Sequence, residues 1–155
     1  MNAIIHFRLN QEEIETRVDS EMTLLRYLRE ERRLTGTKNG CGSGHCGSCT
    51  VLIDGQPAKS CLLKMNRVAG RSVETIEGIG AAGGGPIQTA FLTAGAVQCG
   101  FCTPGMIMNA KALLNSNPKP DEHEIRRALS GVLCRCTGYQ KIVEAVKNAA
   151  SARQP

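Results

Sequence analysis

The sequence predicts an α+β chain in which a small mixed sheet crossed by one helix is followed by an all-helical half. Apolar residues alternate along the first half, which is the period of half-buried strands. Along the second half they recur at three- and four-residue steps, which is the period of helices. Between the halves, residues 78–86 (GIGAAGGGP) are rich in glycine. Four of the eight cysteines lie on each side of this stretch, so we expect two domains joined by a linker.

The first half carries the signals of five strands and one helix. Asp54-Gly55, between two runs of strand-forming residues, is a strong hairpin signal. Three leucines recur at helical spacing in Thr23–Arg33, and Gly36 offers a stop after them. The predicted strands are Ala3–Leu9, Ile14–Val18, Thr50–Ile53, Pro57–Leu63 and Ser72–Ile76.

Four helices are predicted in the second half, each from a start signal and an apolar stripe. Pro86 and Pro104 suit the first turn of a helix, and Asp121 with Glu124 forms a capping-box pair. Short links between the helices predict an antiparallel bundle. The helices are expected over Pro86–Ala94, from Thr103-Pro104 to Asn117-Pro118, from Asp121 to Gly131, and from Tyr139 onward.

The eight cysteines stand in a chain with no tryptophan, three phenylalanines and two tyrosines. A domain of roughly 70–80 residues with so little aromatic area usually depends on disulfides or a metal. The apolar run near the N-terminus is too short for a signal peptide, and no stretch reaches the length of a membrane span. Cytoplasmic metal ligands are therefore favoured over disulfides. A partner exported in the folded state could still carry the chain to the periplasm.

The formal net charge is +5, and basic residues gather at Arg26, Arg29, Arg32 and Arg33. Nucleic-acid binding is disfavoured, because no aromatic stacking platform or groove-reading motif accompanies them. The three- and four-residue steps between Arg26, Arg29 and Arg33 fit the solvent-facing side of an amphipathic helix. A docking surface for a partner is the other interpretation.

The first cysteine quartet, Cys41, Cys46, Cys49 and Cys61, has the spacing C-x4-C-x2-C-x11-C. Its opening is the ligand spacing of plant-type [2Fe–2S] ferredoxins. Glycines at positions 40, 42, 44 and 47 let the loop curl tightly and point backbone N–H groups at an anionic cluster. The fourth cysteine, Cys61, follows Cys49 after only eleven residues. We expect the predicted hairpin at Asp54-Gly55 to bring it back to the other three.

Structural zinc is the alternative for this quartet. Zinc quartets usually come as two C-x2-C-like pairs on separate knuckles, so the spacing favours iron and sulfur. His45 raises a Rieske-type site, which needs a second histidine in a matching loop, and His6 and His123 are not so placed. We expect His45 to face solvent.

The second quartet, Cys99, Cys102, Cys134 and Cys136, has the spacing C-x2-C-x31-C-x-C. Each pair precedes a predicted helix, and two helix N-termini aimed at one anionic cluster would supply free N–H donors. A C-x-C pair also occurs in zinc sites, so the spacing alone leaves zinc open. Arg135, between two ligands, adds positive charge or a partner contact.

Three segments, Gly40–Val51, Gln98–Gly105 and Cys134–Tyr139, together resemble the small iron–sulfur subunit of the molybdenum hydroxylases. This is the family of xanthine dehydrogenase, aldehyde oxidoreductase and carbon monoxide dehydrogenase, and the resemblance covers essentially the whole chain. It implies a plant-ferredoxin-like β-grasp domain over residues 1–77, a linker over 78–86 and a four-helix domain over 87–155. Each domain would hold one [2Fe–2S] cluster, and the chain would carry electrons without a catalytic residue of its own.

The resemblance also implies an assembly, a heterotrimer or a dimer of heterotrimers. A large subunit carries molybdopterin, often as its cytosine dinucleotide, and a medium subunit carries FAD. Electrons released by substrate hydroxylation pass to an inner cluster on the second quartet, then to an outer cluster on the first quartet, and then to FAD. Gln98 is implied to hydrogen-bond the pterin, and Cys136 to lie beside it.

One position departs from the family, because Ser43 stands where members often have an acidic residue. Ligation does not depend on it. A free-standing two-cluster ferredoxin and a structural protein with two zinc sites are the alternatives. Gln98 and the Cys134–Tyr139 loop favour a subunit, since they suit a partner-facing surface. The sequence does not name the substrate among purines, N-heterocycles, aldehydes and carbon monoxide, because no residue here is expected to touch it.

Overall fold

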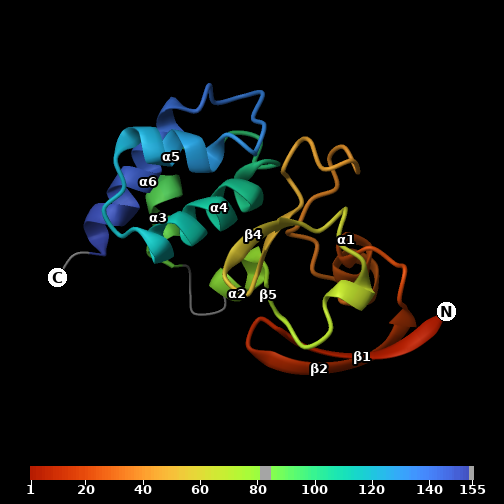
Figure 1. The fold of residues 1–155 in the computed structure, drawn as a ribbon. Coiled ribbons are helices and arrows are strands. Elements are labelled where there is room, and N and C mark those ends of the chain that lie inside the picture. Colours follow the sequence, from red (N-terminus) through yellow and green to blue (C-terminus); the bar gives the residue numbers. More distant parts are fainter. Residues whose placement is uncertain (81–84, 154–155) are drawn as a thin grey trace.

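The first half of the chain forms one mixed five-stranded sheet (Figure 1). In this computed structural model, which describes residues 1–80 and 85–153, the strand order is β2-β1-β5-β3-β4. β5 runs parallel to β1, and the other neighbouring strands are antiparallel. The strands are β1 (Asn2–Leu9), β2 (Glu12–Asp19), β3 (Thr50–Ile53), β4 (Gln56–Lys59) and β5 (Ser72–Glu74). The predicted combination of a mixed sheet with helices is confirmed.

One face of the sheet packs against a helix, and the burial of side chains along β1 alternates accordingly. In β1, Ile5, Phe7 and Leu9 are buried, and the residues between them are exposed. The ring of Phe7 meets the ring of Tyr27 edge-on, with the ring centroids 5.9 Å apart. Tyr27 and Leu28 come from the helix that crosses this face, and they share one core cluster with the strand residues.

The crossing helix consists of α1 (Leu24–Arg26) and a π-helical turn, η1 (Tyr27–Glu31). The Thr23 hydroxyl caps the start of this helix by accepting the backbone N–H of Arg26 at 3.3 Å. Gly36 is not the stop that the sequence suggested. The helix ends at Glu31, and Arg32 caps it by donating its N–H to the carbonyl of Tyr27 at 3.1 Å. Arg33 then takes the left-handed conformation (φ 57°), and the N–H of Leu34 donates to the carbonyl of Leu28 at 2.9 Å.

The hairpin between β3 and β4 forms where the sequence predicted it. Asp54 and Gly55 have φ values of 50° and 80°, and two positive values are typical of a type I′ turn. The second strand is shorter than the predicted Pro57–Leu63. It ends at Lys59, because the N–H of Leu62 turns back and donates to the Lys59 carbonyl at 3.0 Å.

Between β4 and the helical half lie two short helices that the sequence did not predict, η2 (Met65–Arg67) and α2 (Ile76–Gly80). The expected strand Ser72–Ile76 therefore ends at Glu74, and the first residues of the expected linker 78–86 belong to α2. Residues 81–84 of that linker lie outside the described residues. Ile76 and Ile79 of α2 pack against the core of the helical half.

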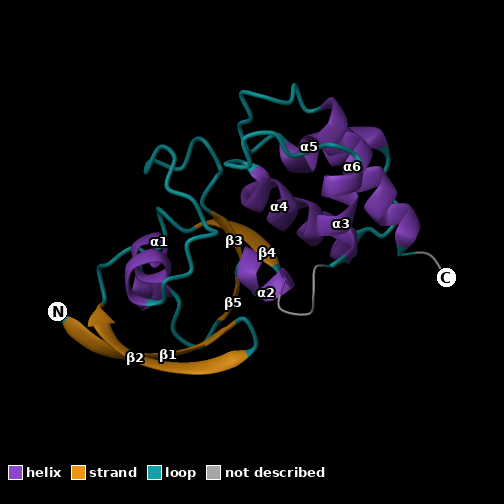
Figure 2. Cartoon of the chain, turned by 180° about the vertical axis from the view of Figure 1, so that it is seen from behind, coloured by secondary structure: helices purple, strands orange, loops and turns teal. Residues whose placement is uncertain are grey.

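The second half forms α3 (Pro86–Thr93), α4 (Thr103–Ser116), α5 (Glu122–Leu129) and α6 (Gln140–Ala152), seen from behind in Figure 2. Pro86 opens α3 and Asn117 caps the end of α4, as predicted. The capping box of α5 is confirmed. The Asp121 carboxylate accepts the N–H of Glu124 at 2.8 Å, and the Glu124 carboxylate accepts the N–H of Asp121 at 2.8 Å.

The two halves meet along α4, which lies against β3 and β4. Lys111 of α4 forms an ion pair with Glu74 of β5, with both side chains largely buried. Lys59, at the end of β4, donates to the carbonyl oxygen of Gly131 at 2.8 Å. Within residues 1–80 and 85–153, no helix combines the length and the apolar character needed to cross a membrane.

Candidate metal centres

The first cysteine quartet lies in the long loop between η1 and β3 and in the turn after β4 (Figure 1). Cys41 is exposed and Cys46 is half-buried, whereas Cys49 and Cys61 are buried. Cys49 immediately precedes β3 and Cys61 follows β4, so the hairpin brings these two residues together. Their Sγ atoms are 3.3 Å apart.

Glycines determine the path of this loop. Gly42, Gly44 and Gly47 have φ values of 66°, 82° and 74°, in the left-handed region that glycine adopts without steric cost. At Gly40 a Cβ atom would lie 2.7 Å from the Sγ atom of Cys46, so a side chain there would press on the thiol. A bare backbone close to the thiols suits an iron–sulfur cluster, whose sulfur atoms accept hydrogen bonds.

The thiols of the first quartet differ in acidity. The Cys41 Sγ atom accepts the N–H of Ser43 at 3.4 Å and the N–H of Cys46 at 3.3 Å. A hydrogen bond from the Ser43 side chain, followed by those from the N–H groups of Cys46 and Ser43, lowers the pKa of Cys41 to about 5. Burial, followed by the neighbouring Cys49 thiol, raises the pKa of Cys61 to about 11. Since the thiolate is the form that binds metal, Cys41 is ready to ligate at neutral pH.

The second quartet gathers where two helices of the second half begin. Cys102 is the N-cap of α4, and Cys134 and Cys136 lie in the loop that leads into α6. The thiol of Cys102 contacts that of Cys134, and the thiol of Cys99 contacts that of Cys136. Cys102 is buried, whereas Cys99 and Cys136 are exposed. One edge of this quartet therefore faces the surface.

Two residues hold the Cys134 end of this quartet in roles that the sequence did not predict. The Tyr139 hydroxyl accepts the N–H of Cys134 at 2.9 Å and donates to the Val132 carbonyl at 3.2 Å. The Thr137 hydroxyl donates to the Cys134 Sγ atom at 3.0 Å. Burial opposes the thiolate of Cys134, but the hydrogen bonds from Thr137 outweigh it and lower the pKa of Cys134. Burial, and then the Cys134 thiol, raises the pKa of Cys102 to about 12.

A backbone hydrogen bond joins the two cysteine loops. The N–H of Leu133, the residue before Cys134, donates to the carbonyl oxygen of Cys46 at 2.8 Å. Gly47 comes so close to the other loop that a Cβ atom there would overlap the carbonyl oxygen of Gly131. Main-chain contacts therefore hold the two quartets side by side.

The eight cysteines are free thiols that neighbour one another in pairs. The pairs are Cys41–Cys46, Cys49–Cys61, Cys99–Cys136 and Cys102–Cys134. In the part of the chain that the structure describes, no three His, Cys, Asp or Glu side chains gather as around a single ion. Two thiols for each of two irons is the donor set of a [2Fe–2S] cluster with four cysteine ligands. The four cysteines of each quartet match this donor set in number and kind.

The two residues expected to contact a partner's cofactor, Gln98 and Cys136, are both exposed. Cys99, which follows Gln98 in the chain, contacts the Cys136 thiol, so both lie at the exposed edge of the second quartet. His45 is exposed, as expected, and its Nδ1 atom lies 3.1 Å from the hydroxyl of Ser43.

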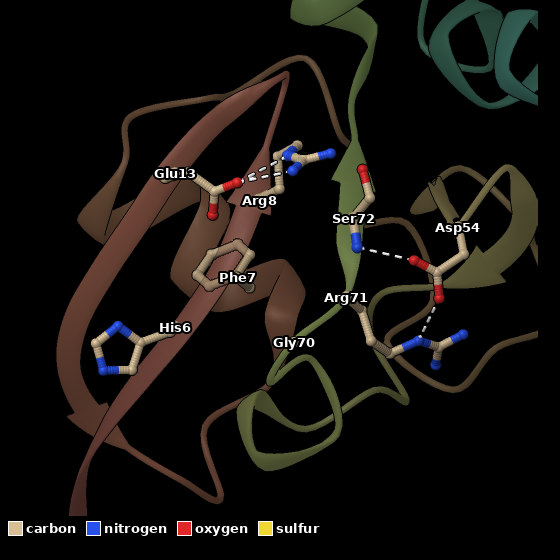
Figure 3. Close-up of a pocket in the computed structure, with 8 residues that line it drawn as sticks. All are labelled: His6, Phe7, Arg8, Glu13, Asp54, Gly70, Arg71 and Ser72. Atoms are coloured by element: carbon tan, nitrogen blue, oxygen red, sulfur yellow. Dashed lines mark hydrogen bonds and ion pairs between the residues drawn. The ribbon is translucent and has the colours of Figure 1, made fainter.

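A pocket of about 300 Å³ lies beside β1 and β5 and is lined by charged side chains (Figure 3). Arg8 donates to the Glu13 carboxylate at 2.8 Å, and Arg71 donates to the Asp54 carboxylate at 2.8 Å. Each guanidinium group is thus paired with a carboxylate of the same pocket. The charges of this pocket neutralise one another, which does not favour a charged ligand.

Two family models match successive parts of the chain: a 2Fe-2S iron-sulfur cluster binding domain over residues 7–72, and a [2Fe-2S] binding domain over residues 75–147. The chain is 50% identical over 132 residues to the nicotine 6-hydroxylase small subunit of Paenarthrobacter nicotinovorans, covering 85% of this chain and 80% of that one. It is 48% identical over 152 residues to the nicotinate dehydrogenase small FeS subunit of Eubacterium barkeri, covering 96% of each. A chain of quinoline 2-oxidoreductase from Pseudomonas putida 86 matches with a TM-score of 0.93 and 43% identity, covering 97% of this chain and 95% of that one.

Proposed function

Because the chain belongs to the small iron–sulfur subunits of the molybdenum hydroxylase family, we propose that it carries electrons from a molybdopterin site on a large subunit, through two [2Fe–2S] clusters, to FAD on a medium subunit. A bound cluster of this kind takes up and releases single electrons. The residues of this chain hold and orient the clusters and take no part in the chemistry of the substrate. The observation that carries the proposal is the arrangement of eight free thiols as two quartets of contacting pairs.

The two quartets have different neighbours in this proposal. The second quartet holds the inner cluster, which faces the pterin. Its exposed edge supports this assignment, because Gln98 and Cys136 lie there and Gln98 offers both a donor and an acceptor. The first quartet holds the outer cluster, which faces FAD. The ligands are Cys99, Cys102, Cys134 and Cys136 for the inner cluster, and Cys41, Cys46, Cys49 and Cys61 for the outer one.

The hydrogen bond between the loops supports transfer from one cluster to the other. It joins the residue before Cys134 to the carbonyl of Cys46 at 2.8 Å. Electrons cross bonded atoms and hydrogen bonds more readily than empty space, so this contact offers a short connection between a ligand of each quartet. Close packing around Gly47 keeps the connection short.

The same proposal includes the finer points of fold and assembly. The sheet with its crossing helix is a β-grasp domain, α3 to α6 form a four-helix domain, and the chain works in a cytoplasmic heterotrimer or a dimer of such trimers. Relatives of the chain are named for nicotine, nicotinate and quinoline. N-heterocycles are therefore the first substrates to try with the assembled complex.

The first test is metal content. The purified chain should hold about four irons and four acid-labile sulfides, and its visible absorbance should bleach on reduction. A colourless protein with stoichiometric zinc would contradict the proposal.

The second test is the order of transfer in the assembled complex. In Cys46→Ser, substrate should still bleach the inner cluster, while reduction of FAD stalls because the outer cluster has lost a ligand. Rapid mixing with substrate, followed at cluster and flavin wavelengths, separates the two steps. Loss of inner-cluster reduction with intact transfer to FAD would reverse the order.

A further inference from the structure

A groove of about 570 Å³ connects three arginines with the first cysteine quartet. Arg26, Arg29 and Arg33 line this arginine groove from the crossing helix and its end, and Gly42 and Cys61 line it from the quartet. From the sequence alone, a solvated helix face was the favoured interpretation of these arginines. Arg26 and Arg33 are indeed exposed, and the structure places all three arginines in one groove with a cysteine of the proposed outer cluster.

The arginine groove carries an excess of positive charge. Its lining has three guanidinium groups and one carboxylate, that of Glu30, which pairs with Arg26 at 2.7 Å. The Arg29 guanidinium donates to the carbonyl oxygens of Thr35 and Thr37 at 2.8 and 2.9 Å. These neutral acceptors fix the position of Arg29 without cancelling its charge. The same two hydrogen bonds stabilise the segment that leads to the cysteine loop.

An exposed apolar side chain stands beside the groove. Leu62 is 60% exposed, follows Cys61 in the chain, and packs over Gly44 of the cysteine loop. An apolar contact surrounded by charged groups is the composition of a protein–protein interface. A phosphate or nucleotide would bind the arginines, but its phosphate groups would make no favourable contact with the apolar Leu62. The Glu30 carboxylate would also repel these phosphate groups.

We propose that the arginine groove docks an acidic surface of the electron-accepting flavin subunit, with Leu62 at the apolar centre of the contact. This rests on the proposed function, in which the first quartet is the exit for electrons. Opposite charges steer two proteins together and raise their association rate by about 10- to 1,000-fold, and salt weakens the effect. Arg26 and Arg33 supply the steering charge, and Arg29 stabilises the groove.

The test mixes the full, cluster-loaded and reduced chain with the purified flavin subunit and follows flavin reduction by stopped-flow absorbance at several salt concentrations. The variant Arg26→Glu/Arg33→Glu reverses two groove charges and leaves Arg29 in place. The control Arg17→Glu/Arg67→Glu changes the net charge equally at exposed positions outside the groove lining. We expect the groove variant to lower the second-order rate at least about tenfold at low salt and to lose most of the salt dependence, while the control stays within about twofold of wild type.

Leu62→Ser should weaken binding of the flavin subunit while the salt dependence of the rate is retained. A groove variant with the wild-type rate and salt dependence overturns the docking proposal and leaves the proposed function intact. A second contrary outcome combines two results: inorganic pyrophosphate binds wild type but not the groove variant, and both proteins reduce the flavin equally fast. This outcome would assign the groove to a small anion and would also overturn docking. If wild type does not reduce the flavin, the proposed function fails. Docking is then tested by co-sedimentation of the chain with the flavin subunit. The proposal requires that the groove variant no longer binds the flavin subunit and that the control variant still does.

Discussion

At the scale of single residues, Tyr27 has a buried hydroxyl without a hydrogen-bond partner in the described part of the chain. The side chain is 1% exposed, and its ring packs against Phe7. An unpaired buried polar group costs about 1–3 kcal/mol, and Tyr27→Phe removes this cost while keeping the ring contact. We expect this variant to raise the free energy of unfolding of the cluster-loaded chain by about 1 kcal/mol, measured by denaturant titration.

Tyr139→Phe is the matched control, because it removes a hydroxyl that makes two hydrogen bonds. The N–H of Cys134 and the carbonyl of Val132 would both lose their partner. This variant should lower the free energy of unfolding by about 1–3 kcal/mol. Equal effects of the two substitutions would contradict the different surroundings of the two hydroxyls.

Cys41 should be the most reactive thiol of the cluster-free chain. Hydrogen bonds from Ser43 and then from Cys46 lower the pKa of Cys41 to about 5, whereas burial first raises the pKa of Cys61 to about 11 and that of Cys102 to about 12. Near neutral pH, iodoacetamide should therefore alkylate Cys41 first, because the thiolate is the nucleophile. Mass spectrometry of peptides sampled over time gives the individual rates.

The same pKa shift has a definite sign in the dependence of stability on pH. Folding lowers the pKa of Cys41 from 9.0 to about 5, so between these values the unfolded chain binds the additional proton. The stabilising contribution is complete above the unfolded value and is lost as the pH falls through about 5. Equal alkylation rates for Cys41 and Cys61 near neutral pH would show that the cluster-free loop does not keep these hydrogen bonds.

At the scale of elements, the turn between β1 and β2 carries strain that one substitution can relieve. Asn10 and Gln11 have φ values of 49° and 75°, and a left-handed residue other than glycine costs about 1–2 kcal/mol. Asn10 is tied to Thr75 by side-chain hydrogen bonds, whereas Gln11 is exposed. We expect Gln11→Gly to raise the thermal midpoint, with a gain of about 1 kcal/mol in the free energy of unfolding.

The control for this turn is Gln56→Gly, at the start of β4, where the φ angle is not positive. Glycine in a strand lowers stability by roughly 0.5–1 kcal/mol, so the two glycine substitutions should act in opposite directions. A loss of stability in Gln11→Gly would show that the turn is not strained.

At the scale of the whole molecule, Gly47 determines how closely the two cysteine loops approach. Its φ value is 74°, and a Cβ atom there would overlap the Gly131 carbonyl oxygen and crowd the Cα atom of Val132. We expect Gly47→Ala to lower the free energy of unfolding by about 1–3 kcal/mol beyond the cost of the left-handed conformation. Separation of the loops should also weaken the magnetic coupling between the reduced clusters, which electron paramagnetic resonance measures.

Gly55→Ala is the matched control for Gly47. Its φ value is 80°, but nothing lies within 4 Å of a Cβ atom at that position. Gly55→Ala should therefore lower the free energy of unfolding only by the cost of a left-handed alanine, about 1–2 kcal/mol. It should leave the magnetic coupling between the clusters unchanged. Identical losses of stability in the two variants would indicate that the loops are not packed as closely as the structure shows.

The sequence by itself determined the features that depend on neighbouring residues. The Asp54-Gly55 turn and the capping box of Asp121 and Glu124 formed where predicted, because each is a hydrogen-bonded or conformational unit of a few residues. The spacing of the first four cysteines favoured an iron–sulfur site. The resemblance of three segments to the small subunits of molybdenum hydroxylases indicated the family, which the comparisons confirmed. Assignment of individual cysteines to the two clusters stays a prediction, as does the domain boundary around residues 78–86.

Only the tertiary structure decided the features that depend on contacts between distant segments. The sequence placed Cys102 and Cys134 in one quartet, but only the structure shows that Cys102 neighbours Cys134 within it. Only the structure shows that the N–H of Leu133 bonds to Cys46 across the two halves. The helix that was expected to stop at Gly36 ends instead at Glu31, and the left-handed Arg33 lets Leu34 fold back onto Leu28. The arginine groove exists because the crossing helix lies beside the first cysteine loop. The sequence pattern indicated which cysteines belong together, but it carries no signal for contacts such as Leu133 with Cys46, since packing energy selects these contacts only when the whole chain is folded.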